Sequence, residues 1–292
     1  MDTRFIETFL AVVDHGSMAE AARRLGLTPA AVAQRMQALE TELGAKLLRR
    51  VGKQVRPTEA GHAILEPARK MVADARLMRS RANAGLTAGE LRLGAISTAL
   101  TGLLPQALLR LRHRFPAVEL FVLPGASADL HAALDAGRID AALLVRPPFE
   151  IPKMRDWHVV RREPLILLVP VDLADRDPLE LIATQPFIRY DRANWGGRLA
   201  QAWLEANNLR PREWLELDQL EAISVMVSNG LGISVLPDWA PPWPEGVAAR
   251  RIPLPAPAME REIGVLWNRD SPGVRLIDAV IGALSETASS IG

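Results

Sequence analysis

The sequence predicts an α/β protein in two parts, a small helical region at the N-terminus and a larger region in which strands and helices alternate. Apolar residues recur at helical spacing up to about residue 83, whereas from residue 90 short apolar runs alternate with helical segments. Charge divides the chain in the same place: residues 1–85 hold 14 Lys and Arg against 9 Asp and Glu, and the remainder holds 21 against 25. The basic excess indicates that a polyanion binds the N-terminal part.

The chain begins with a helix over residues 3–14, followed by two short helices joined by a tight turn. Ser17 and Glu20 have the S-x-x-E spacing of a capping box, and Gly26 supplies the turn. Thr28 is a second N-cap, and Pro29 stands at the first helical position, where a missing N–H costs nothing. The next helix carries an apolar face formed by Val32, Met36, Leu39 and Leu43. The pattern predicts a helix-turn-helix with a recognition helix over residues 29–40.

Basic residues surround this motif and favour DNA as the polyanion, because each neutralised phosphate releases condensed counterions. Residues 47–48 and 54–56 are expected to pair as a small hairpin around Gly52, with its basic side chains on the phosphates. The alternative is that two helices around a glycine occur in many domains and that a basic run is only solvated surface. The expected DNA-contacting residues are Ser17, Thr28, Pro29, Ala30, Ala33, Gln34, Arg35, Gln37, Arg49, Arg50, Lys53 and Arg56.

A long helix follows, capped by Thr58 and running to about residue 83, with Pro67 expected to kink it. Spacings of four and three residues define a heptad seam, for which we expect a partner helix from a second copy of the chain. The alternative is that this face packs on the chain's own N-terminal domain. Residues 84–89 are predicted to form a hinge. The expected dimerisation residues are Ile64, Ala68, Met71, Ala75 and Met78.

From residue 90 the alternating elements predict a parallel sheet, with ligand sites at the carboxyl ends of its strands. We expect strands over residues 91–96, 118–123, 139–145, 165–169, 187–190, 214–217, 233–236 and 263–267. The expected helices span residues 103–114, 127–136, 195–207, 220–228 and 274–284.

The N-terminal residues resemble those of the LysR-type transcriptional regulators. The resemblance rests on Phe5, Phe9, the block GSMAEAARRLGLTPAAVAQRMQALETELGAKLLRR (16–50) and PTEAG (57–61), and the architecture downstream agrees with it. Family members often have Ser, Arg and Gln where this chain has Ala33, Gln34 and Arg35, a departure that concerns which base each residue reads.

This resemblance implies three segments and a two-lobed C-terminal domain. These are a winged helix-turn-helix over residues 1–57, a linker helix and hinge over residues 58–88, and an effector domain over residues 89–292 that resembles type 2 periplasmic binding proteins. Lobe I is expected at about residues 89–161 and 267–292, and lobe II at about residues 162–266. The resemblance also implies a homotetramer built as a dimer of dimers, binding a dyad-symmetric promoter site, with RNA polymerase as a further partner.

Polar residues at strand ends suggest an effector pocket for a small organic anion. An arginine there could hold a carboxylate bidentately while an aromatic ring covers an apolar part. The alternative is that Ser97 and Thr98 only cap a helix and that Arg189, Asp191 and Arg192 pair with one another. The expected effector-binding residues are Ser97, Thr98, Ala99, Leu100, Arg146, Phe149, Tyr190, Arg192, Trp195, Gln219 and Ala222.

Other classes of function find little support in the sequence. The chain has no cysteine, and its five histidines show no metal-ligand spacing, so we expect no metal and no cofactor. No G-x-S-x-G or P-loop motif supports an enzyme fused to a DNA-binding module. No apolar run is long enough to span a membrane, and we expect a cytoplasmic protein. The sequence therefore predicts a transcriptional regulator controlled by a small molecule; the alternative is a ligand-independent architectural DNA-binding repressor.

Overall fold

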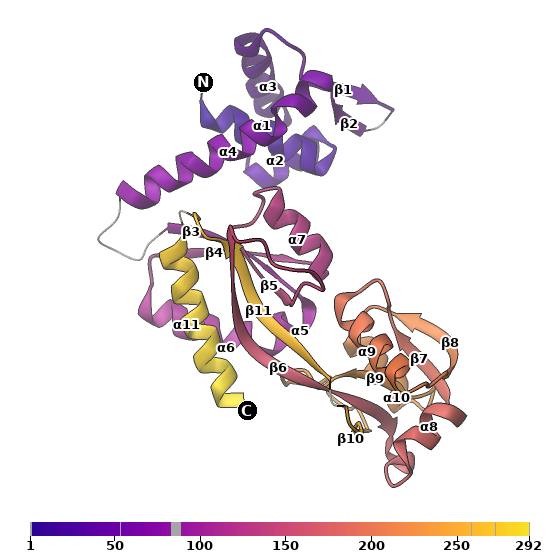
Figure 1. Cartoon of the computed structure of the whole chain (residues 1–292). Helices are drawn as coiled ribbons and strands as arrows, with labels where there is room; N and C mark the ends of the chain where they lie inside the picture. Colours follow the sequence, from indigo (N-terminus) through magenta and orange to yellow (C-terminus); the bar gives the residue numbers. More distant parts are fainter. Residues whose placement is uncertain (1, 53, 83–88, 258, 272, 292) are drawn as a thin grey trace. The chain divides into compact units, whose positions relative to one another are not determined.

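The computed structural model describes residues 2–52, 54–82, 89–257, 259–271 and 273–291. The chain forms two compact units that divide near residue 84, and Lys53 and residues 84–88 of the expected hinge fall outside the described residues (Figure 1). The linker helix belongs to the first unit. Within the described residues, no helix is both long and apolar enough to cross a membrane.

The first unit is a winged helix-turn-helix followed by a long helix. Its core includes Ile6, Phe9, Met36, Leu39 and Leu47, which all lie in one buried cluster. The elements, in chain order, are α1 Thr3–His15, α2 Met18–Leu25, α3 Pro29–Leu43, β1 Leu48–Val51, β2 Gln54–Pro57 and α4 Glu59–Ala82.

The predicted caps position the two helices of the motif. The Ser17 hydroxyl accepts from the Glu20 amide at the start of α2, and the Thr28 hydroxyl accepts from the Ala31 amide at the start of α3. The Glu20 carboxylate pairs with Arg23 rather than closing the capping box. Helix α3 runs three residues beyond the predicted end at residue 40. Leu43 is 40% exposed and so does not belong to the buried face that we expected it to extend.

The wing is a longer hairpin than the sequence indicated. Strands β1 and β2 pair antiparallel from Leu48 opposite Pro57 to Val51 opposite Gln54. Arg49 and Arg50 therefore lie within a strand, and buried Leu47 precedes it.

Helix α4 packs partly on its own domain, which was the alternative to a partner helix. Ala68 and Val72 belong to the same buried cluster as Phe9, and Ile64 packs against that cluster. Our expectation that the whole seam faces a second copy is therefore wrong for Ile64 and Ala68. Met71 and Met78 of the seam are 40% and 67% exposed.

The second unit contains two lobes built around a mixed sheet. Strands β3 Gly89–Ala95, β4 Val118–Pro124 and β5 Ala141–Val145 pair in parallel, whereas β11 Glu260–Asn268 runs antiparallel to β5 and to β6 Arg155–Pro170. The expected parallel sheet is confirmed for β3, β4 and β5, whereas β11 runs antiparallel to its neighbours because β6 and β11 enter and leave the first lobe in opposite directions. The helices of this lobe are α5 Ser97–Gly102, α6 Leu104–Arg114, α7 Ser127–Asp135 and α11 Val274–Ile291.

The second lobe continues from β6. Strands β9 Ser234–Pro237 and β10 Ala249–Pro253 pair antiparallel with its C-terminal half, and β7 Pro186–Tyr190 pairs in parallel with β8 Arg212–Leu217. Helices α9 Trp195–Ala206 and α10 Leu220–Ser228 belong here, with α8 Pro178–Thr184, which the sequence analysis missed together with β10. A short 3₁₀ turn, η1, spans Val171–Leu173.

Two long strands, β6 and β11, join the lobes (Figure 1). Ile263 to Trp267 of β11 pair with β5, a strand of the first lobe. The strand over residues 263–267, which we expected to return to the first lobe, therefore lies in lobe I, and the boundary of lobe II, where β11 crosses between the lobes, falls near Arg261 instead of at about residue 266. This crossing brings residues distant in sequence together beside the cavity described below.

Candidate functional site

The first unit presents the N-terminal part of α3 to solvent. Thr28, Pro29, Ala30, Ala33, Gln34 and Gln37 are all exposed, on the side of the helix away from buried Val32, Met36 and Leu39. Ser17 is half-buried and occupied as the cap of α2. The sequence therefore predicted a solvent-exposed recognition surface at the positions where the fold leaves it open.

Arg35 differs from its neighbours on the recognition helix. Its side chain is half-buried, and its Nη1 donates to the Thr8 hydroxyl of α1 at 3.4 Å. The Thr8 hydroxyl in turn donates to the Arg4 carbonyl at 2.7 Å. Arg35 thus links α3 to α1, which leaves the amide of Gln34 as the more accessible polar group on the exposed face.

The wing concentrates positive charge on a two-stranded ribbon. Arg49 lies directly opposite Arg56, and both are exposed. Like charges opposite one another destabilise a strand pair, so this placement favours an anion that lies against the ribbon. Arg50 is also exposed, and its Nε donates to the Gly52 carbonyl at 3.1 Å.

Glu40 fixes the connection between the recognition helix and the wing. Its carboxylate accepts from Lys46 Nζ at 2.7 Å and from the Leu47 amide at 2.9 Å. Burial disfavours the charged form, but the hydrogen bonds from Lys46, Leu47 and Leu48 outweigh it and hold the pKa of Glu40 below its usual value. The wing is therefore attached to α3 by a charged side chain.

The second unit contains a cavity of about 320 Å³ between its lobes. Lobe I contributes the turns that follow β3, β4 and β5, and lobe II contributes the starts of α9 and α10. The lining residues are Ile96, Ser97, Thr98, Leu100, Pro124, Gly125, Ala126, Ser127, Val145, Tyr190, Asn194, Trp195, Gly196, Asp218, Gln219, Leu220 and Arg261.

Three helices of eight or more residues begin at this cavity. Ser127, Trp195 and Leu220 are the first residues of α7, α9 and α10, and all three line it. A helix N-terminus carries about half a positive charge and unsatisfied N–H groups, which suits an anionic group. At α9 and α10 no side-chain hydrogen bond from Asn194 or Gln219 caps the helix.

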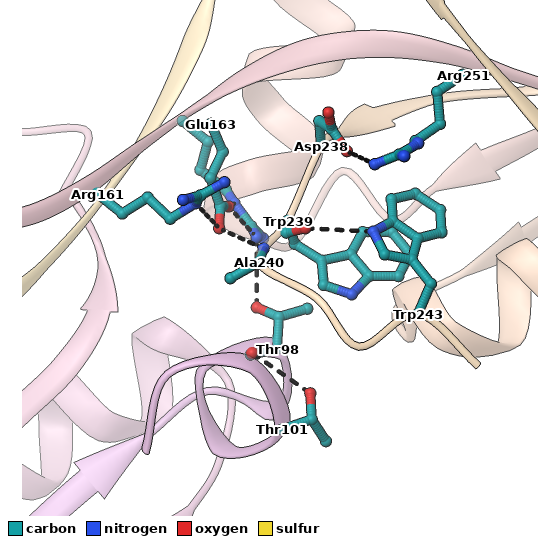
Figure 2. A network of polar contacts seen from close by, with 10 residues as sticks. Thr98, Thr101, Arg161, Glu163, Asp238, Trp239, Ala240, Trp243 and Arg251 are labelled. Carbon is teal, nitrogen blue, oxygen red and sulfur yellow. Dashed lines mark hydrogen bonds and ion pairs between the residues drawn. The ribbon is translucent and has the colours of Figure 1, made fainter. Parts of the chain in front are cut away.

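A buried ion pair lies beside the cavity where the strands cross between lobes. Arg261 and Glu163 are each 2% exposed or less, and Arg261 Nε donates to Glu163 Oε2 at 2.8 Å. Arg261 Nη2 also donates to the Thr98 hydroxyl at 3.3 Å. Glu163 Oε1 accepts from the Ala240 amide at 3.3 Å, and Figure 2 shows Glu163, Ala240 and Thr98 close together. The network joins α5 of lobe I, both crossing strands and a loop of lobe II.

Tyr190 lies at the same cavity and is deeply buried. Burial raises the pKa of its hydroxyl above the usual value, while the positive charge of Arg261 opposes that rise. The phenol therefore stays neutral and presents a hydrogen-bonding group beside the guanidinium.

Two predicted arginines are committed elsewhere. Arg146 pairs with Glu262 at 2.7 Å, and Arg192 pairs with Glu213 at 2.8 Å and Glu216 at 3.2 Å. Neither lines the cavity, so the structure does not support the expectation that they bind the effector. The alternative that residues 189–192 pair among themselves is also wrong, because Arg189 too pairs with Glu213 of β8.

The other predicted residues divide between the cavity and its surroundings. Ser97, Thr98, Leu100, Tyr190, Trp195 and Gln219 line it, whereas Ala99 and Ala222 do not. Phe149 is also outside the lining, but its ring lies 5.7 Å from that of Trp195 and 5.2 Å from that of His131, edge to face. It packs behind the cavity wall.

Four features of the cavity and its surroundings were not predicted from the sequence: Arg261, Glu163, Asp218 and the turn over residues 124–127. The turn carried a usable signal, since LPGAS follows a predicted strand at the same sheet edge as residues 97–100. The sequence also contains a signal for Arg261 and Glu163, because each charged residue stands just before an apolar strand run. It contains no signal that these two residues pair with each other, since 98 residues of chain separate them.

Two family models match the chain. Residues 3–62 match the model described as "Bacterial regulatory helix-turn-helix protein, lysR family", and residues 84–289 match that described as "LysR substrate binding domain". The two matches correspond to the recognition surface of the first unit and to the cavity-bearing second unit.

Individual proteins are similar over nearly the whole chain. The "Probable HTH-type transcriptional regulator LrrA" of Synechococcus elongatus is 30% identical over all of this chain and 99% of its own length. The "HTH-type transcriptional regulator IlvR" of Caulobacter vibrioides is 30% identical over 92% of this chain and 93% of its own. A structure of full-length OxyR from Pseudomonas aeruginosa is 25% identical and superposes with a TM-score of 0.70, covering 97% of this chain and 94% of its own.

Proposed function

The chain belongs to the LysR family of DNA-binding transcriptional regulators, and from this premise we propose that a small organic molecule in the cavity between its lobes controls its binding to DNA. The observation that carries the proposal is the cavity itself, where three helix N-termini and a buried arginine meet between two lobes joined by two strands. This part of the chain is the one that matches the substrate-binding model.

For the DNA contact we propose that the exposed face of α3 enters the major groove. Gln34 and Gln37 can read base edges, because a side-chain amide can pair bidentately with adenine. Arg49, Arg50 and Arg56 of the wing contact phosphates, which position the domain without reading sequence. Lys53 is proposed for the same role from its sequence position alone.

For the response we propose a shift between open and closed lobes. A ligand that contacts both lobes binds the closed form better, and it shifts the equilibrium by that difference in affinity. Because the chain assembles with copies of itself in this proposal, closure alters the spacing of two helix-turn-helix units on DNA.

The assembly is a homodimer, paired into a tetramer, on a dyad-symmetric site. Exposed Met71 and Met78 of α4 support a helix pairing between copies, and buried Ala75 borders them. A contact with RNA polymerase is consistent with such a regulator. Since the proposed target is chromosomal DNA, we place the protein in the cytoplasm, acting as a regulator and not as an enzyme.

The second candidate is a ligand-independent architectural repressor. A protein of that kind has no use for a cavity whose walls come from both lobes, and the cavity therefore favours ligand control.

The test combines a ligand screen with footprinting on the full chain. DNA selected from a random pool is footprinted with and without each carboxylate, amino acid or aromatic compound that raises the melting temperature. We expect a protected dyad whose extent changes with a stabilising compound. A protected dyad that no stabilising compound alters would favour the architectural repressor.

A further inference from the structure

The charges of the effector cavity narrow the class of molecule that it binds. Among the described lining residues, Asp218 and Arg261 are the charged ones. Glu163, buried beside the cavity, pairs with Arg261 and lies 3.7 Å from the Nε of Arg161, so these three side chains together keep one positive charge. The cavity therefore has one positive charge at this network and one negative charge at Asp218.

The cationic groups that could favour a simple anion are engaged. Arg146 is held by Glu262, and Arg192 is held by Glu213 and Glu216. Hydrogen bonds from Arg146 and Arg162 hold the pKa of Glu262 below its usual value, so that partner stays charged. A dianionic ligand would place a second negative charge near Asp218, where neither Arg146 nor Arg192 is free to meet it.

The cavity also presents groups that suit a carboxylate. The N-termini of α7, α9 and α10 present N–H groups there, and Thr98 and Arg261 stand at its edge. Arg261 is almost fully buried, and in the described structure its hydrogen bonds to Glu163 and Thr98 use Nε and Nη2 but not Nη1. A guanidinium has five N–H donors, so it can also bond to a ligand oxygen.

The exposed side chain of Asp218 suits a cation. Within the part of the chain that the structure describes, the Asp218 carboxylate forms no ion pair or hydrogen bond. It stands two residues before Leu220, the first residue of α10. The Asp218 carboxylate and the N-terminus of α10 thus lie side by side. A ligand that carries an ammonium and a carboxylate on one carbon atom could place its ammonium on Asp218 and its carboxylate at the helix N-terminus.

The remaining lining combines polar side chains, such as Ser97 and Asn194, with apolar ones. The larger apolar side chains are those of Ile96, Leu100, Val145, Trp195 and Leu220. We propose that the effector is a zwitterionic α-amino acid with an apolar side chain, its carboxylate at the helix N-termini and its ammonium on Asp218. This inference rests on the proposed function, because it names the ligand class of the same cavity.

The experiment measures ligand affinity of the full chain by calorimetry. The probes are valine, leucine, isoleucine, methionine and phenylalanine, each beside its deaminated acid and its decarboxylated amine. We expect at least one amino acid to bind with one-to-one stoichiometry, and its matched acid and amine to bind at least about tenfold more weakly, since each lacks one charge interaction worth roughly that factor.

Variants assign the ammonium contact. Asp218→Asn should lower the affinity for the amino acid by about tenfold or more and leave the affinity for its deaminated acid unchanged. Asp218→Glu should keep the preference for the amino acid over its deaminated acid. Asp172→Asn, an exposed carboxylate of the same lobe outside the cavity lining, is the matched control and should bind as the wild-type chain does.

Three results would overturn the inference. The first is equal affinity of the wild-type chain for an amino acid and its deaminated acid. The second is an Asp218→Asn variant that still prefers the amino acid over its deaminated acid, and the third is no binding of any of the five amino acids. If instead a dicarboxylate or an aromatic acid binds and alters the footprint, the proposed function stands and the amino-acid assignment fails.

Discussion

The recognition surface and the effector cavity obtain their functional residues in opposite ways. The surface takes them from one continuous stretch, residues 17–56, in which caps, turn and apolar face lie within a few residues of one another. The cavity takes its lining from residues 96–261, on turns of two lobes. The first site is therefore fixed by local interactions and tolerates change elsewhere, whereas the second depends on contacts between distant segments.

The largest effect is expected at the ion pair that joins those distant segments. Arg261→Ala removes the nearer cation from buried Glu163 and leaves it only Arg161, whose Nε lies 3.7 Å from Oε1, and breaking a buried pair in this way typically costs about 3–5 kcal/mol. Unfolding in denaturant should show this loss in the second unit while the first unit keeps its midpoint. The double variant Arg261→Met with Glu163→Leu removes both charges and should recover most of the loss; failure to recover would mean that packing, not charge, dominates there.

A smaller effect is expected on the recognition helix, where the comparison predicts a local consequence. Gln34→Ala should weaken the selected DNA site by about 1–3 kcal/mol and leave binding to random DNA unchanged. Arg35→Ala should lower the affinity for the selected site less than Gln34→Ala does, because the Arg35 guanidinium donates a hydrogen bond to Thr8 of its own domain. Anisotropy titrations on both DNAs measure this, and a larger loss of specific binding in Arg35→Ala would restore Arg35 as the principal base reader.

The wing should show a smaller change that does not depend on sequence. Arg49→Ala and Arg50→Ala should each weaken specific and random DNA alike and reduce the slope of log affinity against log salt by about one. Arg210→Ala, an exposed arginine of the second lobe, is the control and should leave the slope unchanged. A wing variant with an unaltered slope would show that its guanidinium does not lie on a phosphate.

The smallest effect concerns Glu40, whose folded pKa is lowered. Its contribution to stability is present above the unfolded pKa of about 4.3 and is lost as pH falls through the lower folded value. Glu40→Gln should therefore destabilise the first unit by about 1 kcal/mol at neutral pH and less in acid. Melting curves of both proteins across this range measure the difference, and a constant gap at every pH would contradict an ionic role.

The same contrast explains what the sequence could predict. The caps at Ser17 and Thr28, the glycine turn and the strand-helix units followed from short-range rules. The mixed sheet could not be predicted by short-range rules, because the direction of β11 depends on its pairing with β5 and β6, which are far from it in the sequence. Helix α4 shows the same limitation. The heptad spacing of its apolar residues identifies an apolar face, but it does not predict whether Phe9 of the same domain or a second copy of the chain covers that face.

At the cavity, residue type misled where partners were distant. Arg146 and Arg192 have the expected charge at the expected strand ends, but they form ion pairs with Glu262 and with Glu213 and Glu216, respectively. Ser97, Thr98, Tyr190, Trp195 and Gln219 were predicted correctly as lining residues because strand-end turns converge on one sheet edge. Arg261 stands within a strand at the crossing and follows no such rule.

The central claim is that a molecule in the second unit changes how the first unit binds DNA. The most direct measurement is an anisotropy titration of the full chain on its selected DNA, with and without a compound that raises its melting temperature. The account predicts at least about a fivefold change in the dissociation constant for the wild-type chain, the lower range of typical allosteric coupling, and a much smaller change for Thr98→Val, which lacks the hydroxyl bonded to Arg261. Identical affinities with and without a saturating, stabilising compound would contradict it.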